Sequence, residues 1–380
     1  MKNQFILLFF FYVFLINFSF GKNNIYFSGE KNKVFYLEDK LYVNSIITLK
    51  DCENIILTTK FPGKTKLTSN SQLRVINSSR IQVAKLVFEN NFVKDVIRID
   101  NSPNTLIVDN VFINNGNHKT GSVIRLENNS SNSKIQNNTF KSNKCIGIAI
   151  LESSNKVIVE NNYFYSVPSV LSIYPNSNGN GMECIQIGRE GNWKSDALVR
   201  RNYFKDVIGD SAEIISVKSD FAIIEENNFV DCQGGITLRL SNSSTISNNY
   251  FNNTSHSLRI FGAKHKIINN HIENSVVGIQ LPSADKHYTS NKTGAVYRQA
   301  YDILINGNVI LNSRYSIMIG NGYNNKRNFL PYKITIKDNK FNSKSWLNSK
   351  QNISNLVTLN NVTNFSNKYI VDKFIYGKRW

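Results

Sequence analysis

The chain has 380 residues, with 45 Lys or Arg against 27 Asp or Glu, and therefore a formal charge of +18. Its 41% hydrophobic and 19% charged content excludes a disordered polar tract, while 58 Asn residues, which favour turns, mean that the chain turns often. The positive excess favours a polyanionic partner, namely nucleic acid, an acidic polysaccharide or an anionic membrane.

Residues 1–21 have the layout of a secretory signal peptide. Lys2 precedes an unbroken apolar run over 5–16, and Ser19 and Gly21 stand at the −3 and −1 positions of a cleavage site. The run is shorter than the roughly 20 residues that span a bilayer, so we expect no membrane span after signal cleavage; an uncleaved anchor is the alternative. The mature chain, 22–380, is expected to be secreted or periplasmic, where an extracellular polyanion rather than nucleic acid is the partner.

Four cysteines, Cys52, Cys145, Cys184 and Cys232, are widely spaced and form no CxxC pair. This spacing is not that of a zinc site. In an oxidising compartment they allow one or two disulfides, and buried free thiols are the alternative.

A motif of Asn, any residue, and Phe or Ile recurs through the chain. It starts at residues 110, 138, 162, 202, 227, 249, 270, 308 and 339. Alternating runs such as 156–160, 221–225 and 266–269 are typical of short strands, and no long segment has a helical period. We predict an all-β fold: one single-stranded, right-handed, pectate-lyase-like parallel β-helix over 22–380, with about twenty to twenty-five residues per coil.

The repeat gives most of the Asn and Phe residues a structural role. At a fixed corner of each coil, Asn supplies the left-handed backbone, and its amide bonds the Asn of the neighbouring coils as a ladder. The Phe two residues later points inward and stacks in the same way. Most of these residues are therefore not candidates for catalysis.

The repeat is interrupted between Phe164 and Phe204, where a Gly- and Asn-rich insert covers residues 174–188. Functional residues of a solenoid lie on one exposed face or in loops inserted on it. The insert places Asn180 and Glu183 at the start of a strand.

The three following coils add charged residues. Segment 210–219 places Glu213 on a strand face and Lys218 after a bend, and segments 234–239 and 256–259 end in Arg239 and Arg259. Separations of about one coil stack Glu213, Arg239 and Arg259 on neighbouring rungs, which lie about 4.8 Å apart. Together these charges form a site suited to an acidic substrate; solvated charges on a strand face are the alternative.

At these residues the sequence resembles the family six polysaccharide lyases, secreted parallel β-helices that include alginate lyases and chondroitinase B. The resemblance is carried by segments 180–188, 213–219, 235–239 and 258–265, with Asn269 and Asn270 shortly after, and it extends from about Gly63 to Phe341. It implies that Lys218 is the base of a β-elimination and that Arg239 is the acid or carboxylate neutraliser. It further implies substrate contacts from Arg259, Glu183 and His265.

The resemblance also implies a calcium ion held by Asn180 and Glu213. Two positions depart from the family pattern. Ser211 stands where the family commonly has a second Glu, and Leu240-Ser241 stand where it usually has His-Gly. Because a calcium site without that carboxylate loses a ligand and a charge, a metal-independent site is the alternative.

We therefore expect a secreted lyase that cleaves an anionic polysaccharide, alginate first, by β-elimination, as a monomer with a dimer as the alternative. In that reaction the cations neutralise the uronate carboxylate, so that the neighbouring C5 proton becomes acidic enough to be removed. A dermatan sulfate lyase like chondroitinase B and a non-catalytic β-helix that binds polysaccharide are the alternatives. A hydrolytic β-helix is disfavoured because it needs a pair of carboxylates, which Ser211 interrupts. Closure of one end of the groove by the loop 282–297 would decide between endolytic and exolytic cleavage.

Overall fold

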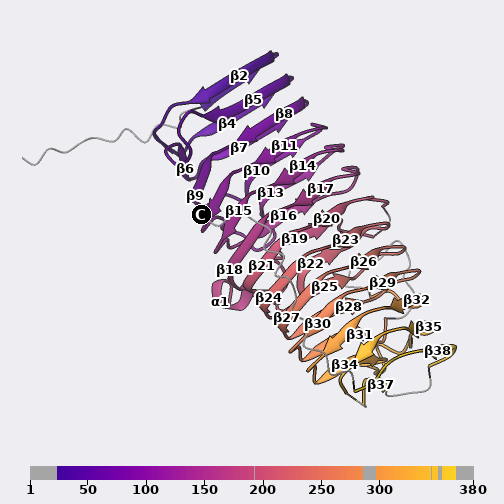
Figure 1. Cartoon of the computed structure of the whole chain (residues 1–380). Helices are drawn as coiled ribbons and strands as arrows, with labels where there is room; N and C mark the ends of the chain where they lie inside the picture. The colour runs from indigo at the N-terminus through magenta and orange to yellow at the C-terminus, as the bar shows by residue number, and fades with distance from the viewer. Residues whose placement is uncertain (1–23, 192, 286–296, 344, 350–352, 365–380) are drawn as a thin grey trace, which may run out of the picture.

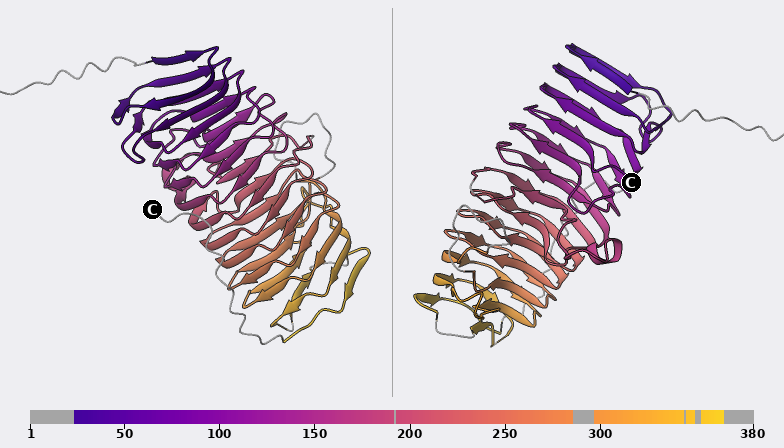
Figure 2. Two further views of the ribbon diagram at one scale, coloured as in Figure 1. Left: turned by 45° about the horizontal axis from the view of Figure 1, so that its top comes forward. Right: turned by 180° about the vertical axis from the view of Figure 1, so that it is seen from behind.

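The computed structural model describes residues 24–364, except 192, 286–296, 344 and 350–352. Its strands pass in a repeating order through three parallel sheets, called sheets A, B and C, and stack into one elongated solenoid (Figures 1 and 2). The predicted parallel β-helix is thus confirmed. The predicted signal peptide lies outside the described residues.

Sheet A contains thirteen strands: β1 (Asn24–Ser28), β4 (Ile46–Lys50), β7 (Gln72–Ile76), β10 (Asp95–Asp100), β13 (Ser122–Glu127), β16 (Ile146–Ile150), β19 (Ile185–Ile187), β22 (Glu213–Val217), β25 (Gly235–Leu238), β28 (His256–Ile260), β31 (Val277–Leu281), β34 (Tyr315–Ile319) and β37 (Leu347–Ser349). Sheet B contains thirteen: β2 (Lys31–Leu37), β5 (Glu53–Thr59), β8 (Ser79–Ala84), β11 (Leu106–Val108), β14 (Lys134–Gln136), β17 (Ile158–Glu160), β20 (Leu198–Arg200), β23 (Ile223–Glu225), β26 (Thr245–Ser247), β29 (Lys266–Ile268), β32 (Tyr301–Asn306), β35 (Tyr332–Lys337) and β38 (Leu356–Leu359). Sheet C contains twelve: β3 (Leu41–Val43), β6 (Lys66–Ser69), β9 (Val87–Asn91), β12 (Val111–Ile113), β15 (Thr139–Lys141), β18 (Tyr163–Ser169), β21 (Tyr203–Gly209), β24 (Asn228–Cys232), β27 (Tyr250–Thr254), β30 (His271–Glu273), β33 (Val309–Leu311) and β36 (Lys340–Phe341).

The helical content of the described chain is a single turn, α1 (Val170–Ile173), in the insert that follows β18. Ser169 caps it by accepting a hydrogen bond from the Leu171 backbone N–H. Nowhere in the described chain is there a helix with the length and apolar character that crossing a bilayer requires.

Parallel pairing keeps similar apolar residues in register from coil to coil. In sheet A, Ile185, Ile215, Ile236, Leu258 and Ile279 are aligned in successive strands, and all are buried. Because side chains alternate across a strand, the residues between these inward positions point outward. The outward face of sheet A is therefore held rigidly by the core beneath it.

The predicted Phe stack runs through the interior below sheet C. Successive rings lie between 4.4 and 5.1 Å apart, centroid to centroid, with interplanar angles of 7 to 18°. The stack contains Phe88, Phe112, Phe140, Phe164, Phe204, Phe229 and Phe251. Aromatic pairs at this spacing gain energy beyond the area they bury.

The predicted Asn ladder is present, and one part of its interpretation is corrected. Asn227 Nδ2 donates to Asn249 Oδ1 at 3.0 Å, and Asn249 repeats the bond to Asn270. The positive φ, however, belongs to the preceding residue, such as Glu226 (56°) or Asn248 (55°). The left-handed backbone therefore belongs to one residue and the amide ladder to the Asn that follows it, because the ladder amide has to point inward.

The four cysteines are buried and free. Of the two alternatives, buried thiols rather than disulfides are found. Burial raises the pKa of Cys232 to about 12, which keeps this thiol protonated.

Candidate active site

The candidate site lies on the outward face of sheet A, between β19 and β28. Lys218 and Arg239 follow directly after Val217 and Leu238, which are paired in register, and each side chain is only 12% exposed. Glu213, Arg239 and Arg259 lie on or directly after the neighbouring strands β22, β25 and β28, as predicted, but the two arginines are not in register. Arg259 is paired with Thr237, two positions earlier than Arg239.

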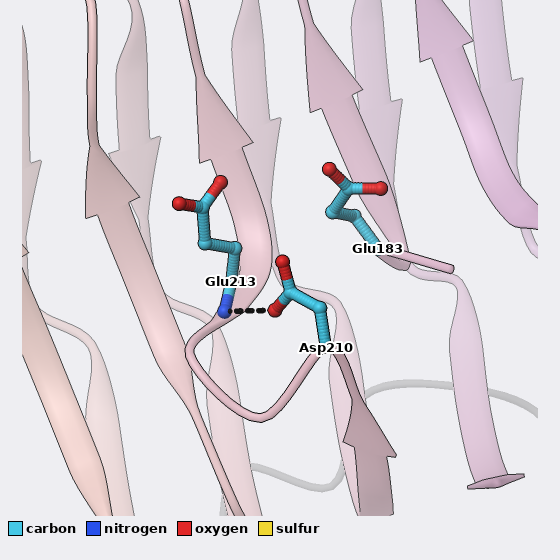
Figure 3. Close-up of side chains that lie close together, drawn as sticks. All are labelled: Glu183, Asp210 and Glu213. Atoms are coloured by element: carbon cyan, nitrogen blue, oxygen red, sulfur yellow. Dashed lines mark hydrogen bonds between the residues drawn. The ribbon is translucent and has the colours of Figure 1, made fainter. Parts of the chain in front are cut away.

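Three carboxylates gather beside these cations. Glu213 is the first residue of β22, Glu183 lies two residues before β19, and Asp210 stands in the turn that leads into β22. One oxygen from each lies within 4.8 Å of the others. Figure 3 shows the carboxylates of Glu183 and Asp210 pointing toward the space between neighbouring strands.

The turn that presents Asp210 is fixed by its own side chain. Asp210 Oδ1 accepts hydrogen bonds from the backbone N–H of Glu213 at 2.7 Å, which Figure 3 shows, and from that of Ala212 at 3.1 Å. This is the side-chain-to-backbone pattern that Asp commonly forms in turns. One oxygen of Asp210 is thereby committed to the backbone.

Two of the three carboxylates, Glu183 and Asp210, have a raised pKa. Burial raises the pKa of Asp210 to about 8, and the negative charges of Glu213 and Glu183 add to this effect. Burial also raises the pKa of Glu183, although the nearby Lys218 opposes the change. Within the described structure, Glu183 Oε2 is buried and has no hydrogen-bond partner. Such a cluster is suited to binding a cation.

Cations face two of the carboxylates at ion-pair distances. Lys218 Nζ lies 3.7 Å from Glu183 Oε1, while Arg239 and Arg259 lie 3.8 and 3.6 Å from Glu213 Oε1. Ser216 also donates its hydroxyl to Glu213 Oε2 at 2.5 Å. Glu213, only 4% exposed, is therefore the centre on which the two arginines converge.

Two site residues were not singled out as functional from the sequence. Asp210 belongs to the carboxylate cluster, and the ring of Tyr297 packs against the guanidinium groups of Arg239 and Arg259. Asp210 lies three residues before Glu213 and could have been found by placing the turn. Tyr297 comes from a non-repeating segment, which gives no periodic signal.

Asn180, predicted as a metal ligand together with Glu213, lies in the insert three residues before Glu183. Asn180 is exposed, and its backbone N–H donates to Asn178 Oδ1 at 3.3 Å. No hydrogen bond of the described residues joins its side chain to Glu213. Glu183, predicted as a substrate contact, stands in the carboxylate cluster instead.

His265 does not face the site, and its prediction as a substrate-binding residue is corrected. It is 1% exposed, and its Nδ1 accepts from the Ser244 backbone N–H at 3.1 Å. Its Nε2 lies 3.0 Å from the Phe261 carbonyl oxygen and 3.2 Å from that of Ser241. Burial lowers the pKa of His265 to about 4. Both ring nitrogens are thus used to join coils.

The two departures from the family pattern have different structural consequences. Ser211 is exposed in the turn after Asp210 with a φ of 72°, so it adds no buried ligand. Leu240 and Ser241 are both buried, and the Ser241 hydroxyl pairs with that of Ser244. The Leu240 and Ser241 side chains are thus shielded from solvent.

A pocket of about 600 Å³ lies where the chain between β18 and β19 meets the loop before β13. The insert after β18 and the loop before β13 form it, and its lining includes His118, Lys119 and Tyr174. The Met182 backbone N–H donates to the Lys119 carbonyl at 3.1 Å, which ties the insert to that loop. The insert therefore reaches from this pocket directly to Glu183.

Solved structures with the same fold include a PL6 family polysaccharide lyase from Pseudopedobacter saltans, with a TM-score of 0.76, 20% identity and 92% of each chain covered. A PL6 alginate lyase in complex with a trisaccharide has a TM-score of 0.78 and 18% identity, over 88% of this chain and 80% of that one. A mannuronic acid specific family 6 lyase from human gut microbiota has a TM-score of 0.71 and 19% identity, over 88% and 82%.

A comparison with curated proteins finds no match. Likeness to the solved structures at these identities shows the fold alone, whereas a family model also tests the sequence itself. The model of the chondroitinase B family matches residues 36–373, which is most of the chain. The chain accordingly belongs to the chondroitinase B family of polysaccharide lyases.

Proposed function

We propose that the protein cleaves a uronic-acid polymer, most readily alginate, by β-elimination, with Lys218 as the base. The observation that carries this proposal is the placement of Lys218 and Arg239 at the same position of adjacent coils, both largely buried on one face. Arg259 extends the positive charge into the next coil. Base and neutralising charge are thus held one strand spacing apart.

In the proposed reaction, neutral Lys218 removes the C5 proton of the uronate. The electrons of the C5–H bond form the C4–C5 double bond, and those of the C4–O bond leave with the glycosidic oxygen. Arg239 and Arg259 neutralise the carboxylate, into which the negative charge on C5 spreads in the transition state. The leaving oxygen takes up a proton from the Lys218 ammonium formed in the first step or from Arg239.

The carboxylate cluster fits a calcium ion. Glu183, Asp210 and Glu213 would hold it, since carboxylate oxygens are the ligands that calcium prefers. The fit rests on the raised pKa of Asp210 and on the unpartnered Glu183 Oε2, both of which a cation would relieve. When bound, such an ion supplies positive charge that neutralises carboxylates of the site and of the substrate. This ligand set keeps Glu213 from the predicted pair and adds Glu183 and Asp210, while the part of Asn180 stays a prediction.

Alginate is favoured because each of its residues carries a carboxylate, which suits clustered arginines. Two of the similar structures are those of an alginate lyase and of a mannuronic acid specific lyase. The alternatives are a dermatan sulfate lyase, as the family name suggests, and a β-helix that binds polysaccharide without turnover. A hydrolytic site is disfavoured, because two carboxylates flanking the scissile bond are required and here three lie together beside cations.

We further propose that the protein is exported and acts as a monomer outside the cytoplasm. The N-terminal apolar run supports export, and the excess of 18 positive charges supports an anionic polymer as the partner; the monomer is a proposal for which a dimer is the alternative. Long-range attraction of an anionic polymer should weaken in salt.

The test is to incubate the protein with polymannuronate, polyguluronate and dermatan sulfate and to follow the ultraviolet absorbance of the unsaturated product. We expect a rise on at least one alginate block and none with Lys218→Ala. Lys205→Ala, which removes an exposed lysine from sheet C, is the matched control and should retain activity. Absence of product from every uronate polymer would disprove the lyase proposal, and activity in Lys218→Ala would disprove the assignment of the base. The same assay with a chelator tests separately whether activity requires calcium.

A further inference from the structure

Tyr297 lies at the centre of three arginines that come from different parts of the chain. Its ring centroid is 5.1 Å from the Cζ of Arg239, 5.0 Å from that of Arg259 and 4.4 Å from that of Arg327. The Phe261 ring packs against the same ring, with the centroids 4.6 Å apart. Tyr297 belongs to the segment between β31 and β32, so the repeat does not itself place it there.

Backbone and ion-pair contacts fix Tyr297 in this position. Its N–H donates to Asp285 Oδ2 at 3.1 Å, and the Asp285 N–H donates back to the Tyr297 carbonyl at 3.2 Å. Asp285 also lies 3.4 Å from Arg327 Nε. One residue further on, Arg298 pairs with Asp220 at 3.5 Å. The position of the Tyr297 ring is thus fixed by contacts of its own backbone and of the next residue.

The ion pairs with the Glu213 carboxylate do not explain how the side chains of Arg239 and Arg259 are oriented. Arg239 and Arg259 approach Glu213 at 3.8 and 3.6 Å, longer than the roughly 2.7–2.9 Å of a charge-assisted hydrogen bond. Guanidinium groups that converge in this way also repel one another. An aromatic ring attracts cations through its negative face, and it restricts where planar guanidinium groups can lie.

We propose that Tyr297 is a positioning residue that holds Arg239 and Arg259 with their charges directed at the carboxylate of the bound uronate. This rests on the proposed function for the role of the arginines, while the contacts themselves do not depend on it. Arg327 contacts the same ring, and Asp285 holds the Tyr297 backbone and pairs with Arg327. The hydroxyl of Tyr297 is not part of the proposal, because the ring face is what contacts the cations.

Loss of the Tyr297 ring should weaken stabilisation of the transition state more than it weakens binding of the substrate. A loosened arginine still attracts a carboxylate, but it no longer meets the charge that develops on the carbanion in a fixed geometry. The variant to compare is therefore Tyr297→Leu, which keeps apolar bulk, with Tyr297→Phe, which keeps the ring. Tyr301→Leu is the matched control, since Tyr301 lies four residues later and stacks on Tyr332 at 5.1 Å.

We expect Tyr297→Leu to lower kcat by about 10- to 100-fold while KM changes by less than about threefold. Tyr297→Phe should retain kcat within about twofold, and Tyr301→Leu should change thermal stability rather than kcat. In a cycle with Arg259→Met, the double variant should lose less activity than the product of the two single losses, because both remove the same positioned charge. A loss in Tyr297→Phe as large as in Tyr297→Leu, unchanged kcat in Tyr297→Leu, or fully multiplicative losses would overturn the proposal.

A second measurement does not need turnover and separates this inference from the proposed function. Side-chain NMR of the arginine Nε–H groups should show the resonances of Arg239 and Arg259 shifted and broadened in Tyr297→Leu but close to wild type in Tyr297→Phe. Unchanged resonances in Tyr297→Leu would overturn the positioning role. If the wild-type protein cleaves no uronate polymer, the proposed function fails, and the NMR comparison still decides whether Tyr297 orders the arginines.

Discussion

Lys218 and Arg239 occupy equivalent positions on adjacent coils, each one residue beyond the paired Val217 and Leu238. The Arg239 N–H donates to the Val217 carbonyl at 2.9 Å, which continues the ladder beyond the two strands. The backbones of the proposed base and of the guanidinium residue are therefore held at the strand spacing of about 4.8 Å by the sheet itself. Their separation does not depend on a mobile loop.

Replacement of Arg239 should reduce turnover strongly. Arg239→Ala removes positive charge from the place where the carbanion develops, and loss of one such group typically costs about 100- to 1000-fold in kcat. Arg239→Lys should recover part of this loss, because it restores the charge but not the planar fork. Initial rates of product absorbance at saturating substrate provide the measurement.

The control for this prediction is Arg98→Ala. Arg98 lies on sheet A several coils earlier, where it pairs with Asp100 at 3.0 Å, so its loss should leave kcat unchanged. Equal losses in the two variants would show that general positive charge, not the position of Arg239, determines turnover.

The carboxylate cluster should make the calcium-free protein less stable as pH rises. Asp210 has a pKa of about 8 in the folded protein, above its ordinary value near 3.8, so the folded state binds its proton more tightly than the unfolded state. This contribution to stability is fully present below about pH 4 and is lost as pH rises through about 8. Thermal denaturation in a chelator should show Tm falling over that window, and added calcium should raise Tm at about pH 8 more than at about pH 5. Equal calcium effects at both values would contradict the proposed ligands.

The substitution Asp210→Asn should change stability and calcium binding in opposite directions. The amide oxygen can still accept the backbone hydrogen bonds, while the loss of charge relieves repulsion from Glu183 and Glu213. In chelator at the higher pH the variant should therefore melt at a higher temperature than wild type. Its calcium affinity, measured by calorimetry, should fall by about tenfold or more with one charged ligand gone. A variant with lower stability and normal calcium affinity would exclude Asp210 from the cluster's function.

The fold could be predicted from the sequence because most coils of the solenoid repeat the same short sequence pattern. Each Asn-x-Phe unit encodes one coil, so the Asn ladder and the Phe stack could be predicted from spacing alone. The residue that carries the positive φ could not, since it varies among Asn, Arg, Glu and Gly, as at Asn137, Arg201, Glu226 and Gly307. There the geometry of the corner, not the residue type, sets the backbone conformation.

Site residues could be predicted from the sequence only where they lie in repeating segments. Lys218, Arg239 and Glu213 follow the coil period and were predicted together. Tyr297 and the turn of Asp210 lie in non-repeating segments, where no period gives the direction of a side chain. His265 was misassigned because sequence could not show that its ring turns into the corner between coils. Part of the 282–297 loop falls outside the described residues, so its predicted role in closing the groove stays a prediction.

Breaking the Asn ladder should destabilise the fold without a direct effect on chemistry. Asn227 Oδ1 accepts from both the backbone N–H and Nδ2 of Asn202 at 3.0 Å, and both donors are buried. Asn227→Ala leaves the Asn202 backbone N–H without a partner, which should cost roughly 1 to 3 kcal/mol, whereas Asn202 Nδ2 still donates to the carbonyls of Val159 and Arg200. Asn176→Ala, in the exposed insert, is the control and should change stability by less than about 0.5 kcal/mol. Similar Tm values for the two variants would contradict a stabilising ladder.

A structural role and a substrate-binding role of His265 predict different effects of its removal. A structural histidine with a pKa of about 4 is neutral in the folded protein, while the unfolded chain takes up a proton near pH 6.5. The stability it contributes is therefore present above about pH 6.5 and is lost as pH falls toward about 4. We expect His265→Ala to lower Tm by several degrees near neutral pH, to weaken the dependence of Tm on pH over that window, and to keep KM within about twofold at a temperature where it is folded. His118→Ala, at an exposed position, is the control for a general effect of removing a histidine. A large increase in KM with unchanged Tm would instead restore His265 as a substrate contact.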